Sequence, residues 1–180
     1  MHENGNLYMR INSTLRKKCE RIKIILTDVD GVLTDGGRYY SDAGEILKKF
    51  HVRDGMGINL LLKNGIKTII VTKENSKITK RWAKDMNISK VISGSQNKEN
   101  ELSKICKKFD VSKSEVAYIG DDVNDLNLLM KVGFSAVPND ADENIKNHVD
   151  YICAKIGGMG AFREISNMII VSKLERKKLA

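Results

Sequence analysis

A short apolar run that ends in two aspartates constrains this chain more than any other feature. Residues 23–34 read KIILTDVDGVLT, so the apolar run is followed at once by Asp28 and Asp30. A continuous apolar run of this length is typical of a strand buried on both faces of a parallel sheet. In open α/β sheets, ligands bind just beyond the carboxyl ends of such strands. The two carboxylates therefore lie where a binding or catalytic site is expected, although two solvated acids are the alternative for an isolated pattern of this kind.

Strand patterns alternate with helical patterns along most of the chain. Further strands are expected at 67–71, 91–92, 116–119, 134–137 and 151–152. Helices are expected at 12–21, 76–86, 96–109 and 126–130, with a helical turn at 142–147 and a last helix after residue 164. Another helix, after Arg53-Asp54-Gly55, is expected to run through Ile58, Leu61 and Leu62 and to be closed by Asn64-Gly65. This alternation predicts a three-layer α/β sandwich built on a parallel sheet. Residues 36–50 differ, because aromatic and apolar positions flank a Ser-Asp-Ala-Gly turn, which indicates an inserted β-hairpin.

Composition limits the class and the location of the protein. A chain of 180 residues with 41% hydrophobic and 30% charged residues is typical of a single soluble globular domain. No apolar run approaches the ~20 residues of a membrane span, and the N-terminus lacks the apolar core of a secretory signal. We therefore expect a cytoplasmic protein with no membrane partner. Cys19, Cys106 and Cys153 are far apart in the sequence, which argues against a disulfide framework and against a zinc site.

The net charge of +8 is concentrated in the two ends of the chain. Residues 1–23 carry six Lys/Arg against two Asp/Glu, and residues 173–180 carry four against one, which leaves 21 against 20 in residues 24–172. A nearly neutral core, without aromatic residues interleaved among its lysines, argues against a nucleic-acid partner. We divide the chain into a basic N-terminal extension (1–21), one globular domain (22–172) and a basic C-terminal tail (173–180).

Three further sequence features could complete a site beside the two aspartates. Thr72 ends the expected strand 67–71, so its hydroxyl would point into the same crevice as Asp28 and could donate a hydrogen bond. Lys98 stands where a helix is expected to begin, and an ammonium there can neutralise developing negative charge. Neither is distinctive alone, because threonine is common in strands and the chain has 31 basic residues.

The run Gly-Asp-Asp-Val-Asn-Asp at residues 120–125 is more specific. It places three carboxylates at the end of a buried strand, where they would repel one another unless a cation lies among them. Mg²⁺ prefers oxygen ligands and needs only a few carboxylates from the protein. A calcium loop is excluded, because the run lacks the twelve-residue spacing of acidic ligands and the closing glutamate.

Taken together, these motifs resemble those of the haloacid dehalogenase superfamily of phosphatases. The superfamily signature Asp-x-Asp-x-x-x-Thr corresponds here to Asp28, Asp30 and Thr34, and its second and third motifs to Thr72 and Lys98. The resemblance implies that Asp28 is the nucleophile that takes the phosphoryl group, and that Asp30 is the general acid and base. Thr72 and Lys98 would complete the catalytic set.

The resemblance also implies an Mg²⁺ cofactor. Asp28, the backbone carbonyl of Asp30, and Asp121 would be its ligands. Around them, three residues of the same acidic run would order these ligands: Asp122, Asn124 and Asp125.

Within the superfamily, the chain is most similar to the 3-deoxy-D-manno-octulosonate 8-phosphate phosphatases and their sialic-acid-type relatives. This narrower resemblance rests on residues 28–36, the hairpin, Arg53-Asp54-Gly55, residues 120–125 and the glycine-rich residues 157–164. It implies a Rossmann-like domain without a cap, a homotetramer, and hydrolysis of a phosphorylated 2-keto-3-deoxy sugar acid. The expected substrate contacts are Thr34, Arg53, Glu74 and Arg163.

One departure from the octulosonate phosphatase pattern concerns the residues after Thr72. These enzymes usually continue with Gly-Arg-Asn-Ser, whereas this chain reads Lys73-Glu74-Asn75-Ser76. A glutamate here is more similar to the N-acylneuraminate or KDN 9-phosphate phosphatases, so a nine-carbon substrate is the alternative. A catalytically silent oligomerisation or regulatory domain of a sialic-acid-type pathway is an alternative of another class, which Mg²⁺-dependent hydrolysis of a phosphate ester would exclude.

Overall fold

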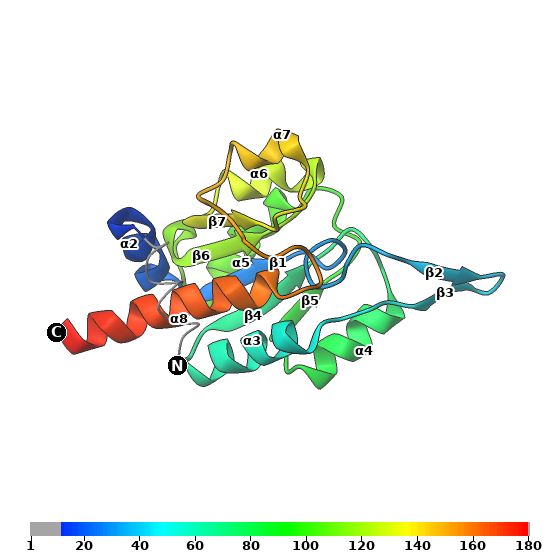
Figure 1. Cartoon of the computed structure of the whole chain (residues 1–180), viewed down its shortest axis with the longest axis horizontal. Coiled ribbons are helices and arrows are strands. Elements are labelled where there is room, and N and C mark those ends of the chain that lie inside the picture. Colours follow the sequence, from blue (N-terminus) through cyan, green and yellow to red (C-terminus); the bar gives the residue numbers. More distant parts are fainter. Residues whose placement is uncertain (1–11, 180) are drawn as a thin grey trace.

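A six-stranded sheet forms the centre of the protein. The computed structural model describes residues 12–179, and Figure 1 shows its helices packed around the sheet. The strands lie in the order β5-β4-β1-β6-β7-β8, and every neighbouring pair is parallel. Their bounds are β1 (Ile24–Thr27), β4 (Lys67–Val71), β5 (Lys90–Ile92), β6 (Val116–Ile119), β7 (Phe134–Val137) and β8 (Tyr151–Ile152).

The central strand β1 is buried on both faces, as its sequence predicts. Side chains alternate across a strand, so Ile25 packs into one apolar cluster and Ile24 and Leu26 into another. Helices α2 (Ser13–Arg21), α3 (Val52–Lys63), α4 (Lys77–Asp85) and α8 (Ala161–Leu179) contribute to the first cluster, and helices α5 (Glu99–Phe109), α6 (Leu126–Leu129) and α7 (Glu143–Lys146) to the second. The predicted three-layer α/β sandwich is confirmed.

The predicted hairpin is also confirmed. Strands β2 (Tyr39–Ser41) and β3 (Gly44–Leu47) pair antiparallel and project from the body of the protein (Figure 1). Two contacts fix the base of the hairpin: Thr34 forms a β-bridge with Phe50, and the Phe50 ring stacks on Trp82 of α4 with the ring centroids 4.2 Å apart. Among residues 12–179, no segment forms a cap domain over the sheet.

Helix boundaries differ from the sequence prediction at two places. Helix α3 begins at Val52, so Arg53 and Asp54 belong to its first turn, and helix α8 begins at Ala161 instead of after residue 164. For α8 the cause is Asp54, which is fully buried and accepts hydrogen bonds from the N–H groups of Gly160 (3.2 Å) and Arg163 (2.8 Å). A carboxylate that accepts from the first N–H groups of a helix stabilises an early start.

The basic chain ends are packed on the domain where the structure describes them. Helix α2 lies against α8, and its Cys19 is fully buried. Helix α8 continues through the expected tail to Leu179, while residues 1–11 of the expected extension lie outside the described part of the chain. The three cysteines are free thiols. No helix within residues 12–179 is both long and apolar enough to cross a membrane.

Candidate active site

Three predicted residues follow neighbouring strands of the sheet. Asp28 comes directly after β1, Thr72 directly after β4, and Asp121 two positions after β6. Because β4, β1 and β6 are adjacent and parallel, their carboxyl ends meet at one edge of the sheet. The Asp28 N–H donates to the carbonyl of Ile119 at 3.0 Å, which fixes the start of the loop after β1. This edge of the sheet is the candidate active site.

The loop after β1 is held together by its own residues. The N–H of Thr34 donates to the carbonyl of Val29 at 3.0 Å. The Thr34 hydroxyl is buried, lies 3.3 Å from the same carbonyl and 3.4 Å from Oδ1 of Asp30, and accepts from the N–H of Gly36. Thr34 therefore orders the loop, and its expected contact with substrate stays a prediction.

Two glycines allow separate backbone segments to meet beneath this loop. Gly31 has a φ of +82°, and a Cβ there would lie 1.9 Å from Oδ2 of Asp121. A Cβ on Gly157 would lie 1.9 Å from the carbonyl oxygen of Gly31, and the N–H of Gly158 donates to the carbonyl of Val32 at 2.9 Å. Only glycine permits such close approach. The glycine-rich segment before α8 thus supports the loop that carries the aspartates.

Lys98 links two of the carboxylates. Its side chain is 1% exposed, and its Nζ lies 2.7 Å from Oδ2 of Asp28 and 2.6 Å from Oδ1 of Asp125. The Tyr118 hydroxyl also donates to Oδ1 of Asp125 at 2.6 Å, and the N–H of Asp121 donates to Oδ2 at 2.9 Å. Since both oxygens of Asp125 are bonded within the protein, this residue orients its neighbours. Tyr118 was not predicted, because a tyrosine in a buried strand pattern gives no functional signal.

Two carboxylate oxygens at the site have no partner. Oδ1 of Asp28 and Oδ1 of Asp121 are buried without a hydrogen bond, and carboxylate oxygens of Asp28, Asp121 and Asp125 all lie within 4.8 Å of one another. Burial raises the pKa of Asp28 to about 6, although the charge of Lys98 opposes the rise. Burial, followed by repulsion from Asp28 and Asp125, raises the pKa of Asp121 to about 8.

This donor set fits a divalent cation. A buried oxygen without a partner costs free energy, and here two such oxygens come from carboxylates that repel each other. A hard cation that accepts only oxygen ligands would satisfy both and offset the repulsion. Asp28 and Asp121 are therefore the residues best placed to hold Mg²⁺.

The rest of the acidic run lies further out. Asp122 is exposed, and its Oδ1 accepts from the N–H of Val123 at 2.7 Å, which begins a short 3-10 turn over Val123–Asp125. Asn124 is exposed on that turn. Their expected role around the metal stays a prediction.

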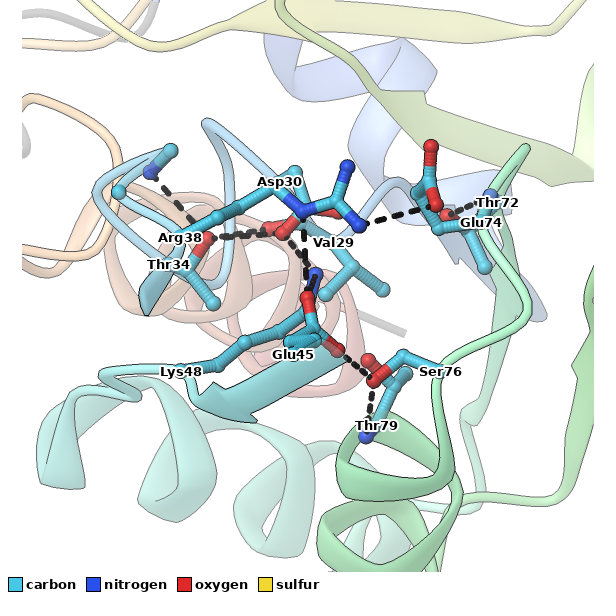
Figure 2. Close-up of polar contacts among 12 residues, drawn as sticks. Val29, Asp30, Thr34, Arg38, Glu45, Lys48, Thr72, Glu74, Ser76 and Thr79 are labelled. Carbon is cyan, nitrogen blue, oxygen red and sulfur yellow. Dashed lines mark hydrogen bonds and ion pairs between the residues drawn. The ribbon is translucent and has the colours of Figure 1, made fainter. Parts of the chain in front are cut away.

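A buried lysine that was not predicted lies beside Asp30. The Lys48 side chain follows β3 and is fully inaccessible, and its ammonium is paired with Oδ1 of Asp30 and, at 3.3 Å, with Oε1 of Glu45. The other oxygen of Glu45 accepts from the Ser76 hydroxyl. Figure 2 shows these contacts running from the loop after β1 to the start of α4. The pattern Leu-Lys-Lys-Phe places Lys48 and Lys49 on opposite faces of a strand but does not indicate which face is buried.

The expected substrate contacts are only partly brought together. Glu74 is half-buried, and its Oε2 accepts from Nη2 of Arg38, a residue of the hairpin, at 3.2 Å (Figure 2). Arg53 is exposed on α3. Arg163 is half-buried on α8 and donates from Nε to Asn167 at 2.8 Å. Among residues 12–179, neither Arg53 nor Arg163 forms a bond with the aspartate cluster, so their substrate roles stay predictions.

Comparisons with known proteins agree with this geometry. A parallel sheet that gathers an aspartate pair, a lysine and an acidic loop at one edge defines a haloacid dehalogenase-like hydrolase, and the family model for such hydrolases matches residues 62–161. The chain belongs, within this class, to the family of 3-deoxy-D-manno-octulosonate 8-phosphate phosphatases known as KdsC.

Curated relatives and solved structures support this assignment. The KdsC of Haemophilus influenzae is 41% identical over 87% of this chain and 87% of its own length. That of Escherichia coli K12 is 34% identical over 95% and 92%. A crystal structure of the Moraxella catarrhalis phosphatase, in complex with a magnesium ion, a phosphate ion and KDO, has a TM-score of 0.86 and 35% identity over 91% of this chain and 94% of that one.

Proposed function

We propose that this protein is an Mg²⁺-dependent phosphatase that hydrolyses 3-deoxy-D-manno-octulosonate 8-phosphate. The observation that carries this proposal is the pair of buried, unpartnered oxygens on Asp28 and Asp121, beside the buried ammonium of Lys98. These groups form a site for a cation and a phosphoryl group. The substrate follows from the family, whose curated relatives over most of this chain are named for it.

The reaction divides into two displacements at phosphorus. In the first, the Asp28 carboxylate forms a bond to phosphorus while the bond to the sugar oxygen breaks, and Asp30 gives its proton to that oxygen. In the second, Asp30 takes a proton from water, the water oxygen attacks the acyl-phosphate, and inorganic phosphate leaves. Asp28 and Asp30 thereby return to their starting states.

Other residues of the chain support these two steps. Lys98 holds the Asp28 carboxylate and offsets negative charge on the phosphoryl group. Thr72 directly follows the neighbouring strand β4, and its hydroxyl, which accepts from the N–H of Glu74 at 3.3 Å, could still donate to a phosphoryl oxygen. Asp28, Asp121 and the backbone carbonyl of Asp30 are the groups that would hold Mg²⁺. When bound, the ion supplies positive charge against the phosphoryl oxygens.

A phosphate-release assay on purified sugar phosphates tests the proposal. With Mg²⁺, we expect turnover of the octulosonate 8-phosphate to exceed that of the N-acylneuraminate and KDN 9-phosphates, and excess chelator should abolish it. Asp28→Asn should lower kcat by about three orders of magnitude or more. Asp85→Asn is the matched control, because Asp85 is an exposed partner of Arg81 on α4, and it should leave kcat unchanged.

Three results would contradict the proposal. If Asp28→Asn keeps more than a few per cent of wild-type turnover, Asp28 is not the nucleophile. If a nine-carbon substrate is preferred, the alternative raised by Glu74 is correct. If none of the esters is hydrolysed in Mg²⁺, a silent oligomerisation or regulatory domain is the remaining interpretation.

We further propose that the protein acts as a homotetramer. The hairpin exposes four large apolar side chains, each more than half accessible: Tyr39, Tyr40, Ile46 and Leu47. Exposed apolar surface concentrated on one projecting element is typical of a contact between chains. Multi-angle light scattering should give about four times the chain mass, and Ile46→Asp should lower that mass. A monomer with full activity would contradict the proposal.

A further inference from the structure

Lys48 is the most unusual charged residue outside the aspartate cluster. Its side chain is fully inaccessible, whereas Leu47 and Lys49 on either side of it are exposed. A buried ammonium costs free energy unless it is paired and hydrogen-bonded. Lys48 meets this need with two carboxylates, one on Asp30 and one on Glu45. The fold therefore places a lysine of the hairpin directly against the expected general acid.

The contacts of Asp30 are all on one of its two oxygens. Lys48 and the Thr34 hydroxyl both bond to Oδ1. Among residues 12–179, Oδ2 has no such partner. Hydrogen bonds to one oxygen fix the rotation of the carboxyl group about its bond to Cβ. The other oxygen then stays available for the proton that moves to or from the substrate.

Lys48 is in turn held in place by α4. Oε1 of Glu45 accepts from both Lys48 (3.3 Å) and Arg38 (3.2 Å), and Oε2 accepts from Ser76, the N-cap residue of α4. Burial acts to raise the pKa of Glu45, but the hydrogen bond from Ser76 and the charge of Lys48 outweigh burial and hold that pKa below its ordinary value. Glu45 therefore stays ionised and keeps the ammonium in position (Figure 2).

We propose that Lys48 is a positioning residue for the general acid and base: it fixes Oδ1 of Asp30 so that Oδ2 exchanges the proton with the leaving oxygen and with water. This inference rests on the proposed function, because it assigns a role within that reaction. It also gives the hairpin a part in the chemistry, since Lys48 directly follows β3.

The role of Lys48 predicts an unequal effect on two aryl phosphate esters whose leaving groups differ in basicity. Protonation by the general acid matters more for a strongly basic leaving group than for a weakly basic one. Incorrect orientation of the Asp30 carboxyl group should therefore slow the hydrolysis of phenyl phosphate more than that of 4-nitrophenyl phosphate. The parameter to compare is kcat/KM, which covers the steps up to departure of the alcohol. Complete loss of general acid catalysis lowers the rate by about 10²–10⁴-fold. Loss of positioning alone should lower kcat/KM for phenyl phosphate by a factor that approaches about 10².

The experiment measures kcat/KM for both esters with wild type, Lys48→Met and Lys49→Met in Mg²⁺. We expect Lys48→Met to lower the value for phenyl phosphate at least about 10-fold more than that for 4-nitrophenyl phosphate. Lys49→Met is the matched control, because Lys49 is exposed and pairs with Asp35 at 3.0 Å, and it should leave the ratio of the two values unchanged. Lys48→Arg keeps a cationic donor, so its ratio of the two kcat/KM values should lie closer to that of wild type than the ratio for Lys48→Met does.

The ratio of the kcat/KM values for the two esters does not depend on the folded fraction of a preparation, because both values are measured on the same protein. If Lys48→Met yields too little protein, Lys48→Leu likewise removes both the charge and the donor and gives the same comparison. Equal falls for both esters, or no fall for either, would overturn the inference and leave Lys48 a structural residue. Wild-type protein that hydrolyses neither aryl ester nor the octulosonate 8-phosphate would overturn the proposed function, and the inference with it.

Discussion

Replacing Asp121 by asparagine should stabilise the metal-free protein while removing its activity. In the absence of a cation, Asp121 lies near two other carboxylates, and its Oδ1 is buried without a partner. An amide has almost the same shape and carries no charge. Asp121→Asn therefore removes repulsion from the folded state but also removes a carboxylate that Mg²⁺ needs. The free energy of unfolding without metal should rise while the activity with Mg²⁺ is lost.

The size of the effect follows from the pKa of Asp121. That pKa is about 8 in the metal-free fold, against 3.8 for an ordinary aspartate, and one pKa unit corresponds to about 1.4 kcal/mol. The full difference corresponds to roughly 5–6 kcal/mol at pH 8 and above. Asp121 is only partly buried, so water entry reduces the penalty, and we expect Asp121→Asn to gain about 2–3 kcal/mol there.

The sign of the pH dependence is fixed by linkage. A carboxyl group whose pKa is raised on folding binds its proton more tightly in the folded state, so the contribution of Asp121 to stability is most favourable at low pH and falls as pH rises from about 4 to 8. Urea unfolding in chelator should therefore show the advantage of Asp121→Asn at pH 8 and a much smaller advantage at pH 5.

Added Mg²⁺ gives the second half of this test. Wild type should gain stability from it, by about 2.7 kcal/mol at a hundred times the Kd, and Asp121→Asn should gain little. A variant that is less stable than wild type in chelator at pH 8, or whose advantage grows as pH falls, would refute the reasoning.

Three further substitutions test other parts of the structure. Glu74→Arg breaks the 3.2 Å pair with Arg38, and kcat/KM for the octulosonate relative to the nine-carbon phosphates should rise by about tenfold, the value of one charged contact; an unchanged ratio would make Glu74 a surface residue. Trp82→Ala removes the stacking partner of Phe50 and should lower the free energy of unfolding by about 1–3 kcal/mol, whereas no change in the urea midpoint would show that the stack contributes nothing. Tyr118→Phe deletes the 2.6 Å hydrogen bond to Asp125 and should lower the free energy of unfolding by about 1.5–3 kcal/mol. The loss of kcat should be less than about tenfold, because Lys98 still holds that carboxylate. A much larger loss of kcat in folded protein would give Tyr118 a direct catalytic role.

The sequence predicted the parts of the site that depend on strand ends. Asp28, Thr72 and Asp121 each follow an apolar run, and parallel strands bring such positions to one edge wherever the helices lie. Lys98 was found because it stands at a helix start between two such motifs. Local pattern was sufficient for Asp28, Thr72 and Asp121, since their placement depends on the sheet alone.

Residues whose role depends on packing between distant segments were not predicted. Lys48 and Lys49 are adjacent and chemically identical, and only the way the hairpin base lies on α4 decides that Lys48 is buried. Likewise, the early start of α8 depends on Asp54, more than a hundred residues away in the chain. Periodicity reports which face of an element is apolar, but it does not report which element that face will meet.

The close contact between Gly157 and Gly31 also determines when the enzyme can form during its own synthesis. The ribosome produces the chain from its N-terminus, so the loop with Asp28 and Asp30 emerges well before the glycine segment that supports it. Helix α8, whose Phe162 and Ile165 belong to the core, follows later still. A chain that ends before residue 157 therefore carries Asp28 and Asp30 without the support of this segment, and we expect it to lack activity.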